Sequence, residues 1–242
     1  MIRNVMNAHF FKLIHEADCP NGVGELLDIQ ASIISGYAVP LRSEHITFFN
    51  DIIIPLHKVQ SVPNFFEKLV RCAMLFVVKD QALIAPLVDG LLKYWPFGNA
   101  GKEILFLQEL AELMQYHEMV DVQGIDVLVP RLFNRLIKCI TSAHVRVQDA
   151  SLCLFEIQSF VALMRKHKEI TYPMLIPNVL DTGKGHWLET LALTFQSLRQ
   201  ILKEIEPEAY ANATKQTQPD TDKQREELDK KWQQINANLK NQ

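Results

Sequence analysis

Apolar residues recur at helical spacing along almost the whole chain. In "GELLDIQASII", for example, Leu26, Leu27 and Ile34 fall on one stripe of a helix. Similar stripes occur in "FFEKLVRCAMLFVV", "KEILFLQELAELMQ", "RLFNRLIKCI" and "LETLALTFQSLRQILKEI". Strand signals are almost absent, because no segment sustains an apolar–polar alternation and no Asn-Gly turn joins two β-branched runs. The pattern predicts an all-α protein with about ten helices of roughly 10 to 20 residues, joined by short polar links.

A short apolar run followed by proline occurs four times, in "IIIPLHK", "LIAPLVD", "VLVPRLF" and "MLIPNVL". The prolines, Pro55, Pro86, Pro130 and Pro177, are separated by 31, 44 and 47 residues. Two helices per roughly 40 residues is the period of HEAT-type repeats. Proline is tolerated in the first turn of a helix and kinks the helix when it lies deeper, and the sequence leaves both placements open.

These repeats predict a HEAT-like helical-repeat solenoid, a curved stack of about five antiparallel helix pairs in which each pair buries its apolar face against its neighbours. An irregular helical domain with scattered prolines is the alternative. We expect the solenoid to span residues 1–210. Residues 211–242 are polar, and we expect a partly mobile segment with a possible short helix there. Such a helix would carry one narrow apolar stripe, formed by Leu228, Trp232, Ile235 and Leu239. A largely disordered tail is the alternative for this segment.

Composition and charge argue against several classes of function for this chain. Apolar residues make up 48% of the chain, charged residues 22%, and the formal net charge is -3. A nucleic-acid-binding protein usually carries a strong basic excess, so we expect no nucleic acid among the partners. No apolar stretch approaches the roughly 20 residues that a membrane helix needs, and the first residues lack a signal-peptide pattern, so we expect no membrane insertion. Four widely spaced cysteines favour reduced thiols and a cytoplasmic or nuclear location.

The chain offers no pattern typical of an enzyme or a metal site. The "GVG" segment lacks the further glycines and the lysine of a phosphate-binding loop, and no histidine pair has the HExxH spacing. No Ser-His-Asp or Cys-His order is visible along the sequence. We therefore expect no cofactor, no metal and no catalytic residues, although an enzyme with an unrecognised site remains a competing hypothesis.

One helix carries aliphatic residues at the edge of its apolar stripe. Successive side chains on a helix are about 100° apart, so Ile29 lies roughly 120° and Ile33 roughly 80° from the centre of that stripe. The two residues are one turn apart, and we expect them to be partly exposed and to form one wall of a groove. The alternative is that both isoleucines pack on a neighbouring repeat.

Two basic residues follow at the start of the next predicted helix. They are Arg42 and His45, and Ser43 between them is a good candidate for the N-cap residue. An apolar ledge beside a cation and a helix N-terminus suits a peptide that has aliphatic anchors and acidic neighbours. In the alternative interpretation, Arg42 is an ordinary surface charge.

Six segments resemble the B-prime regulatory subunit family of protein phosphatase 2A. They run in order along the chain: "NGVGELLDIQASIISGYAVPLRSEH", "IPLHKV", "LLKYWP", "KCITSAH", "GHWLETL" and "KKWQQI". The first and third of these segments are highly specific. One departure is the segment "LFEIQ" at Leu154–Gln158, where the family has an aromatic–Trp–Asn–Asn–Glu run.

The resemblance implies a HEAT-like solenoid with a non-catalytic role. Such subunits join a phosphatase scaffold subunit and a catalytic serine/threonine phosphatase subunit, and they select substrate or adaptor proteins through motifs of the form Leu-x-x-Ile-x-Glu. The positions that match the family's docking groove are Ile29, Ile33, Arg42 and His45, with arginine at position 42 where the family usually has lysine. A helical-repeat adaptor or scaffold protein without a phosphatase partner is the alternative function.

The resemblance also implies that the first helix, "MIRNVMNAHFFKLIHE", is the second helix of a repeat. Roughly the N-terminal half of a usual family member, with groove residues of the preceding repeat, would then be missing. We therefore expect the chain to represent a fragment or a short divergent version, with a groove that is only partly formed. We also expect an exposed apolar surface on this helix, formed by Met6, Phe10, Leu13 and Ile14.

Overall fold

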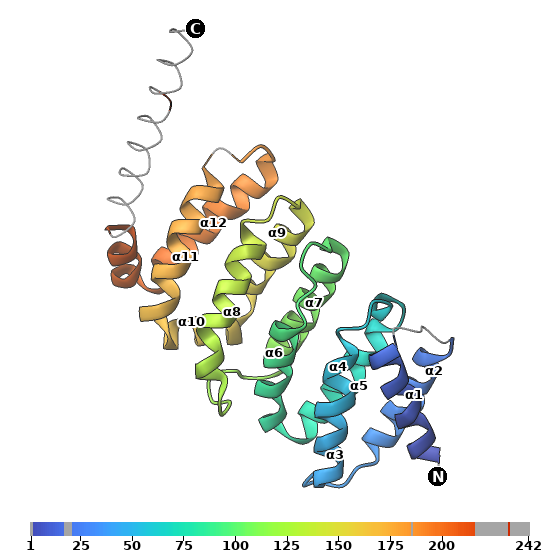
Figure 1. Ribbon diagram of the computed structural model, residues 1–242. Helices are drawn as coiled ribbons and strands as arrows, with labels where there is room; N and C mark the ends of the chain where they lie inside the picture. The colour runs from blue at the N-terminus through green and yellow to red at the C-terminus, as the bar shows by residue number, and fades with distance from the viewer. Residues whose placement is uncertain (1, 17–20, 185, 216–231, 233–242) are drawn as a thin grey trace, which may run out of the picture. The chain divides into compact units, whose positions relative to one another are not determined.

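The computed structural model describes residues 2–16, 21–184, 186–215 and 232. The chain divides into two compact units, Met1–Lys166 and His167–Gln242, and each is described by itself. All regular elements in the described residues are helices, so the predicted all-α fold is confirmed (Figure 1).

The first unit contains most of the helices. They are α1 (Ile2–Glu16), α2 (Val23–Ser35), α3 (Ser43–Phe48), α4 (Ile54–Leu56), α5 (Phe66–Lys79), α6 (Ile84–Lys93), α7 (Ala100–Tyr116), α8 (Ile125–Ile140), α9 (Val145–Leu152) and α10 (Gln158–Lys166). A π-helical turn, Phe49–Ile53, joins α3 to α4, and short 3-10 turns lie at Val62–Asn64, Gln81–Leu83 and Cys153–Glu156.

The helices of the first unit form two layers. In one layer α1 contacts α4, α4 contacts α6, and α6 contacts α8. In the other layer α2 contacts α5, α5 contacts α7, and α7 contacts both α9 and α10. Consecutive segments of the chain alternate between the layers, so each repeat buries its apolar faces against its neighbours (Figure 1). The predicted helical-repeat architecture is confirmed.

Helical periodicity explains the core of these layers. The stripe of α2 buries Val23, Leu27 and Ile34 completely or almost completely, whereas Leu26, also expected on this stripe, is only half-buried. Large aromatic side chains fill the space between helices of the first unit. Those with no exposed surface are Phe10, Phe49, Phe76, Phe106, Phe133 and Phe160.

The expectation of an exposed apolar surface on α1 is wrong. Met6, Phe10, Leu13 and Ile14 are all buried, with at most 7% of each residue exposed. The reason is that α1 contacts α4 and the π-helical turn, so its apolar stripe faces the following repeat.

The four prolines occupy different places within helices. Pro86 lies in the first turn of α6, where its missing N–H needs no partner. Pro130 lies inside α8, and Pro177 lies inside α11 together with Pro173. Pro55 lies in the first turn of α4, two positions after the last residue of the π-helical turn, and the Ile54 N–H donates to the Phe49 carbonyl five residues back. Both placements that the sequence left open therefore occur.

Close packing between α4 and α6 depends on Gly90. A Cβ atom at this position would collide with the side chain of Ile54, which is itself almost completely buried. Gly90 therefore allows two helices of one layer to approach closely in the middle of the first unit.

The second unit contains α11 (Lys168–Gly183), α12 (Glu189–Ile205) and a further helix over residues 207–215. The hydroxyl of Tyr172, which is fully buried, donates to the Leu202 carbonyl over 3.1 Å and links α11 to α12. This pair is the fifth that the described residues show, as the proline period predicted. Of the predicted C-terminal stripe, Leu228, Ile235 and Leu239 lie outside the described residues, while Trp232 is helical and exposed. The boundary at residue 210 stays a prediction.

Within the described residues, no single helix is both long and apolar enough to cross a membrane. One pair, Val145–Glu156 with Gln158–Lys166, is bent by 80° and meets the length and composition criteria only when both parts are taken together.

Candidate functional site

Ile29 and Ile33 lie on α2, at the edge of the face that packs on α5. Half of Ile29 is exposed, at 50%, and Ile33 is half-buried. Leu27 and Ile34, which centre the buried face, are covered completely. The two isoleucines therefore form a small aliphatic ledge at the surface of α2. We call this pair the α2 ledge.

Arg42 and His45 lie at the N-terminus of α3, as their spacing suggested. The predicted N-cap at Ser43 is wrong by one residue, because Ser43 is already helical and Arg42 is the N-cap residue. The Arg42 side chain is 79% exposed and lies 3.8 Å from the Glu44 carboxylate. His45 is buried, and its Nδ1 accepts a long 3.4 Å hydrogen bond from the Arg42 backbone N–H. Arg42 therefore presents its charge to the solvent, whereas His45 is buried and contacts the backbone of Arg42.

Tyr37, which the sequence analysis missed, connects the two parts of the site. Its ring stacks on the His45 ring at a centroid distance of 3.7 Å and an interplanar angle of 5°. Its hydroxyl accepts a 3.5 Å hydrogen bond from Gln30 of α2, and its ring also lies 6.0 Å from the ring of Phe76 in α5. Tyr37 thus links α2, α3 and α5. The only sequence signal for it is an aromatic residue in the polar connection "SGYAVP".

Lys79 holds the connection between α2 and α3 from the end of α5. Its ammonium donates to the Ser35 carbonyl over 3.1 Å and to the Tyr37 carbonyl over 2.8 Å. Carbonyl groups at a helix C-terminus have no partner within the helix, and a lysine there also interacts favourably with the helix dipole. Lys79 therefore fixes the backbone that leads from the α2 ledge to Arg42.

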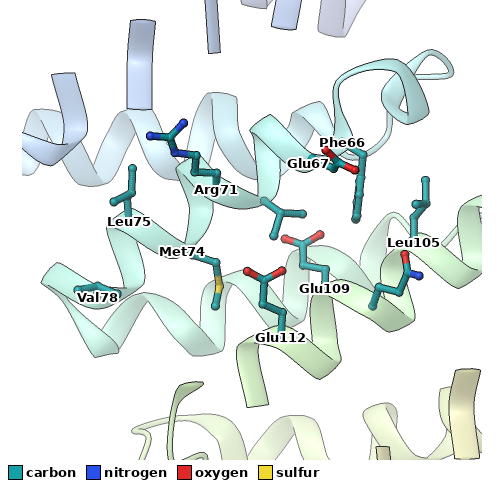
Figure 2. A pocket seen from close by; sticks show the side chains of 11 residues that line it. Phe66, Glu67, Arg71, Met74, Leu75, Val78, Leu105, Glu109 and Glu112 are labelled. Atoms are coloured by element: carbon teal, nitrogen blue, oxygen red, sulfur yellow. The ribbon is translucent and has the colours of Figure 1, made fainter. Parts of the chain in front are cut away.

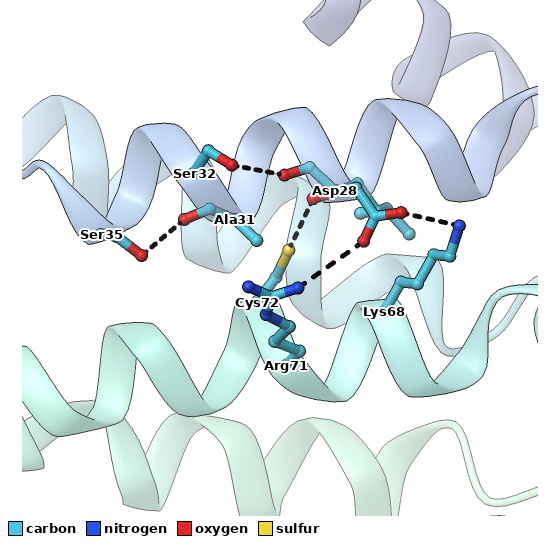
Figure 3. A network of polar contacts seen from close by, with 8 residues as sticks. Asp28, Ala31, Ser32, Ser35, Lys68, Arg71 and Cys72 are labelled. Carbon is cyan, nitrogen blue, oxygen red and sulfur yellow. Dashed lines mark hydrogen bonds and ion pairs between the residues drawn. The ribbon is translucent and has the colours of Figure 1, made fainter.

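A polar network lies next to Ile29 (Figure 3). The Asp28 carboxylate accepts from Lys68 at 2.7 Å and lies 3.9 Å from Arg71, both of which belong to α5. The hydrogen bond that Lys68 donates to Asp28 raises the pKa of Lys68. Below this pair, the buried Cys72 thiol donates to the Leu27 carbonyl over 3.3 Å. These contacts fix the rotation of α2 against α5, so they set which way the α2 ledge faces.

A groove of about 580 Å³ lies between α5 and α7 (Figure 2). Its apolar lining includes Phe66 and Met74, and its polar lining includes Arg71, Glu67 and Glu112. Burial, and secondarily the nearby Glu109 carboxylate, raise the pKa of Glu112. Because Arg71 also pairs with Asp28, this groove adjoins the network beside the α2 ledge. The surface of this layer is thus continuous from α2 to α7.

The part of the chain that the structure describes contains no cluster of three His, Cys, Asp or Glu side chains that could hold a metal ion. Of the three free cysteines described there, Cys72 and Cys139 are buried and Cys153 is exposed. Burial raises the pKa of the Cys72 and Cys139 thiols to about 12. Neither buried thiol is therefore a nucleophile near neutral pH.

A comparison with known protein families identifies one family that matches almost the whole chain. Residues 1–239 match the family described as protein phosphatase 2A regulatory B subunit (B56 family). The match includes the α2 ledge, the α3 N-terminus and the helices behind them, and it extends through the second unit.

Individual relatives are named as regulatory subunits of protein phosphatase 2A. The B' beta isoform of the 57 kDa regulatory subunit of serine/threonine protein phosphatase 2A from Arabidopsis thaliana is 34% identical over 89% of this chain. The delta isoform of the 56 kDa regulatory subunit from Homo sapiens is 30% identical over 97% of the chain. The delta 2 isoform from Schizosaccharomyces pombe is 32% identical over 98% of the chain. The chain spans only 42%, 39% and 38% of these three relatives, respectively.

Proposed function

Because this chain belongs to the B56 family of protein phosphatase 2A regulatory B subunits, we propose that it acts as a non-catalytic regulatory and substrate-targeting subunit of a protein phosphatase 2A complex. The single observation that carries the proposal is the family match over residues 1–239. The partners would be a phosphatase scaffold subunit and a catalytic serine/threonine phosphatase subunit, in the cytoplasm or the nucleus.

We further propose that the α2 ledge and Arg42 dock short motifs of the form Leu-x-x-Ile-x-Glu. Ile29 and Ile33 offer partly exposed aliphatic surface, which suits the aliphatic residues of such a motif. Arg42 offers an exposed guanidinium, which suits the glutamate because arginine can donate two parallel hydrogen bonds to one carboxylate. Tyr37 and Lys79 support this arrangement by holding the connection between the two parts.

Complex formation tests the first proposal. The full chain, carrying an affinity tag, is mixed with purified scaffold and catalytic subunits of protein phosphatase 2A and separated by size-exclusion chromatography. We expect the chain to co-elute with both subunits and the purified chain alone to show no phosphatase turnover. A chain that elutes alone under conditions in which a full-length family member assembles would favour the adaptor alternative. Turnover by the chain alone would favour an enzyme.

A further inference from the structure

A cluster of cationic and amide side chains covers one face of α8. Arg131, Asn134, Arg135 and Lys138 follow the spacing of three and four residues that places side chains on a single helix face. Together with Leu92 of α6 they line a hollow of about 210 Å³. We call this feature the α8 hollow. It belongs to the layer of α6 and α8, whereas the α2 ledge belongs to the other layer of the first unit.

Arg135 is the least exposed cation of the hollow. Its guanidinium lies 4.0 Å from the centre of the Phe97 ring and 5.5 Å from the centre of the Trp95 ring. Its Nε atom is buried and has no hydrogen-bond partner among the described residues. Burial also lowers the pKa of Arg135, which means that its surroundings do not fully compensate its charge. An anion in the hollow would supply the missing compensation.

Two carboxylates act on the cluster, and neither neutralises it fully. Asp89 forms an ion pair with Arg131, whose side chain is still half-exposed. Glu103 acts on Arg135 through its charge alone. Lys138 is exposed and has no ion-pair partner in the described part of the chain. Cations four residues apart on a helix repel each other, so the spacing of Arg131 and Arg135 does not serve the stability of α8.

We propose that the α8 hollow binds the phosphoryl group of a phosphorylated protein segment. Guanidinium and ammonium groups are the side chains that recognise phosphate, and a phosphoryl group offers several acceptor oxygens at one point. Phe97 is exposed beside the hollow and offers an apolar contact for the peptide that carries the phosphate, which favours a protein-borne group over a free anion. The net charge of -3 disfavours a polyanion such as nucleic acid.

The test uses the full chain and two fluorescein-labelled acidic peptides of the same sequence, one with a single phosphoserine and one without. Binding is followed by fluorescence anisotropy. The test variants are Lys138→Glu and Arg131→Gln. The matched control for Arg131→Gln is Arg146→Gln, which removes one positive charge at an exposed position of α9. Far-UV circular dichroism of each variant checks that its helical fold is retained.

We expect the phosphorylated peptide to bind at least about tenfold more tightly than the other peptide, and each test variant to lose most of that preference. Arg146→Gln should behave as the unaltered chain does. Equal binding of the two peptides would overturn the proposal, as would equal losses in the test and control variants, which would indicate non-specific electrostatic attraction.

A competition experiment with inorganic phosphate tests whether the α8 hollow recognises a protein-borne phosphoryl group or free phosphate. A Trp187→Phe, Trp232→Phe chain retains Trp95 as its only tryptophan, next to Arg135, so its fluorescence reports occupation of the hollow. Phosphate should compete with the phosphopeptide but bind more weakly. Binding of inorganic phosphate as tight as that of the phosphopeptide would overturn the assignment to a protein-borne group.

Discussion

His57 and Glu109 form a buried ion pair although they lie 52 positions apart in the chain. The Nε2 atom of His57 lies 3.2 and 3.1 Å from the two carboxylate oxygens of Glu109, and its Nδ1 lies 2.9 Å from the Ile54 carbonyl. Both ring nitrogens therefore face oxygen atoms, and the doubly protonated imidazolium satisfies both with N–H donors. The pair connects the end of α4 to α7, and thus the two layers of the first unit.

Glu109→Gln should destabilise the chain by about 2 kcal/mol or more, because it removes one partner of a buried charged hydrogen bond and leaves the other in an apolar environment. Glu118→Gln is the matched control, since Glu118 follows the same helix and is exposed. Urea unfolding followed by circular dichroism measures both. Equal effects of the two substitutions would mean that the ion pair does not stabilise the first unit.

The pair should also make stability depend on pH. Burial by itself lowers the pKa of His57, but the charge and hydrogen bond of Glu109, with backbone carbonyls, raise it above its ordinary value of 6.5. The folded chain therefore binds this proton more tightly than the unfolded chain does. The stabilisation is fully present below about pH 6.5 and is lost as pH rises through the raised pKa. The free-energy difference between the unaltered chain and Glu109→Gln, measured from pH 6 upward, should shrink accordingly. A constant difference would contradict this expectation.

Substitutions in the docking site should weaken binding of a Leu-x-x-Ile-x-Glu peptide. Ile33→Asp places a carboxylate in the aliphatic wall, and Arg42→Glu reverses the charge opposite the motif's glutamate. Loss of a contact that dominates binding typically costs about 2 kcal/mol, which is more than tenfold in affinity. Titration of a fluorescent motif peptide measures this effect, with Leu193→Asp, at an exposed aliphatic position of α12, and Arg146→Glu as matched controls. Unchanged affinity in both docking variants would assign these residues a structural role.

Lys79→Met should weaken binding of the same peptide although Lys79 does not belong to the proposed contact surface. Methionine keeps most of the aliphatic stem but cannot donate to the Ser35 and Tyr37 carbonyls. We expect about a fivefold loss of affinity, which corresponds to the free energy of roughly one hydrogen bond. Amide hydrogen exchange in the connection over residues 36–42 should also become faster. Lys58→Met, at an exposed lysine of the same unit, is the control. An unchanged exchange rate would show that Lys79 does not hold this connection.

Helical periodicity by itself indicated the fold class and most of the buried face of α2. Leu27 and Ile34 were identifiable as core residues because a regular helix repeats every 3.6 residues, whatever surrounds it. The recurring proline phrase likewise indicated paired helices with a period near 40 residues. The same local rule placed Ile29 and Ile33 at the edge of a buried stripe, where the structure leaves them partly exposed.

The tertiary structure alone decided which segments meet. Periodicity marks an apolar stripe but not its partner, and this is why α1 was expected to be exposed although it packs on α4 and the π-helical turn. The contact of His57 with Glu109 and the hydrogen bonds from Lys79 to the end of α2 join segments 42 to 52 residues apart. Such contacts depend on how whole helices stack, which no local spacing encodes. Tyr37 owes its role to the same stacking, because its neighbours on α2, α3 and α5 come together only when the repeats pack.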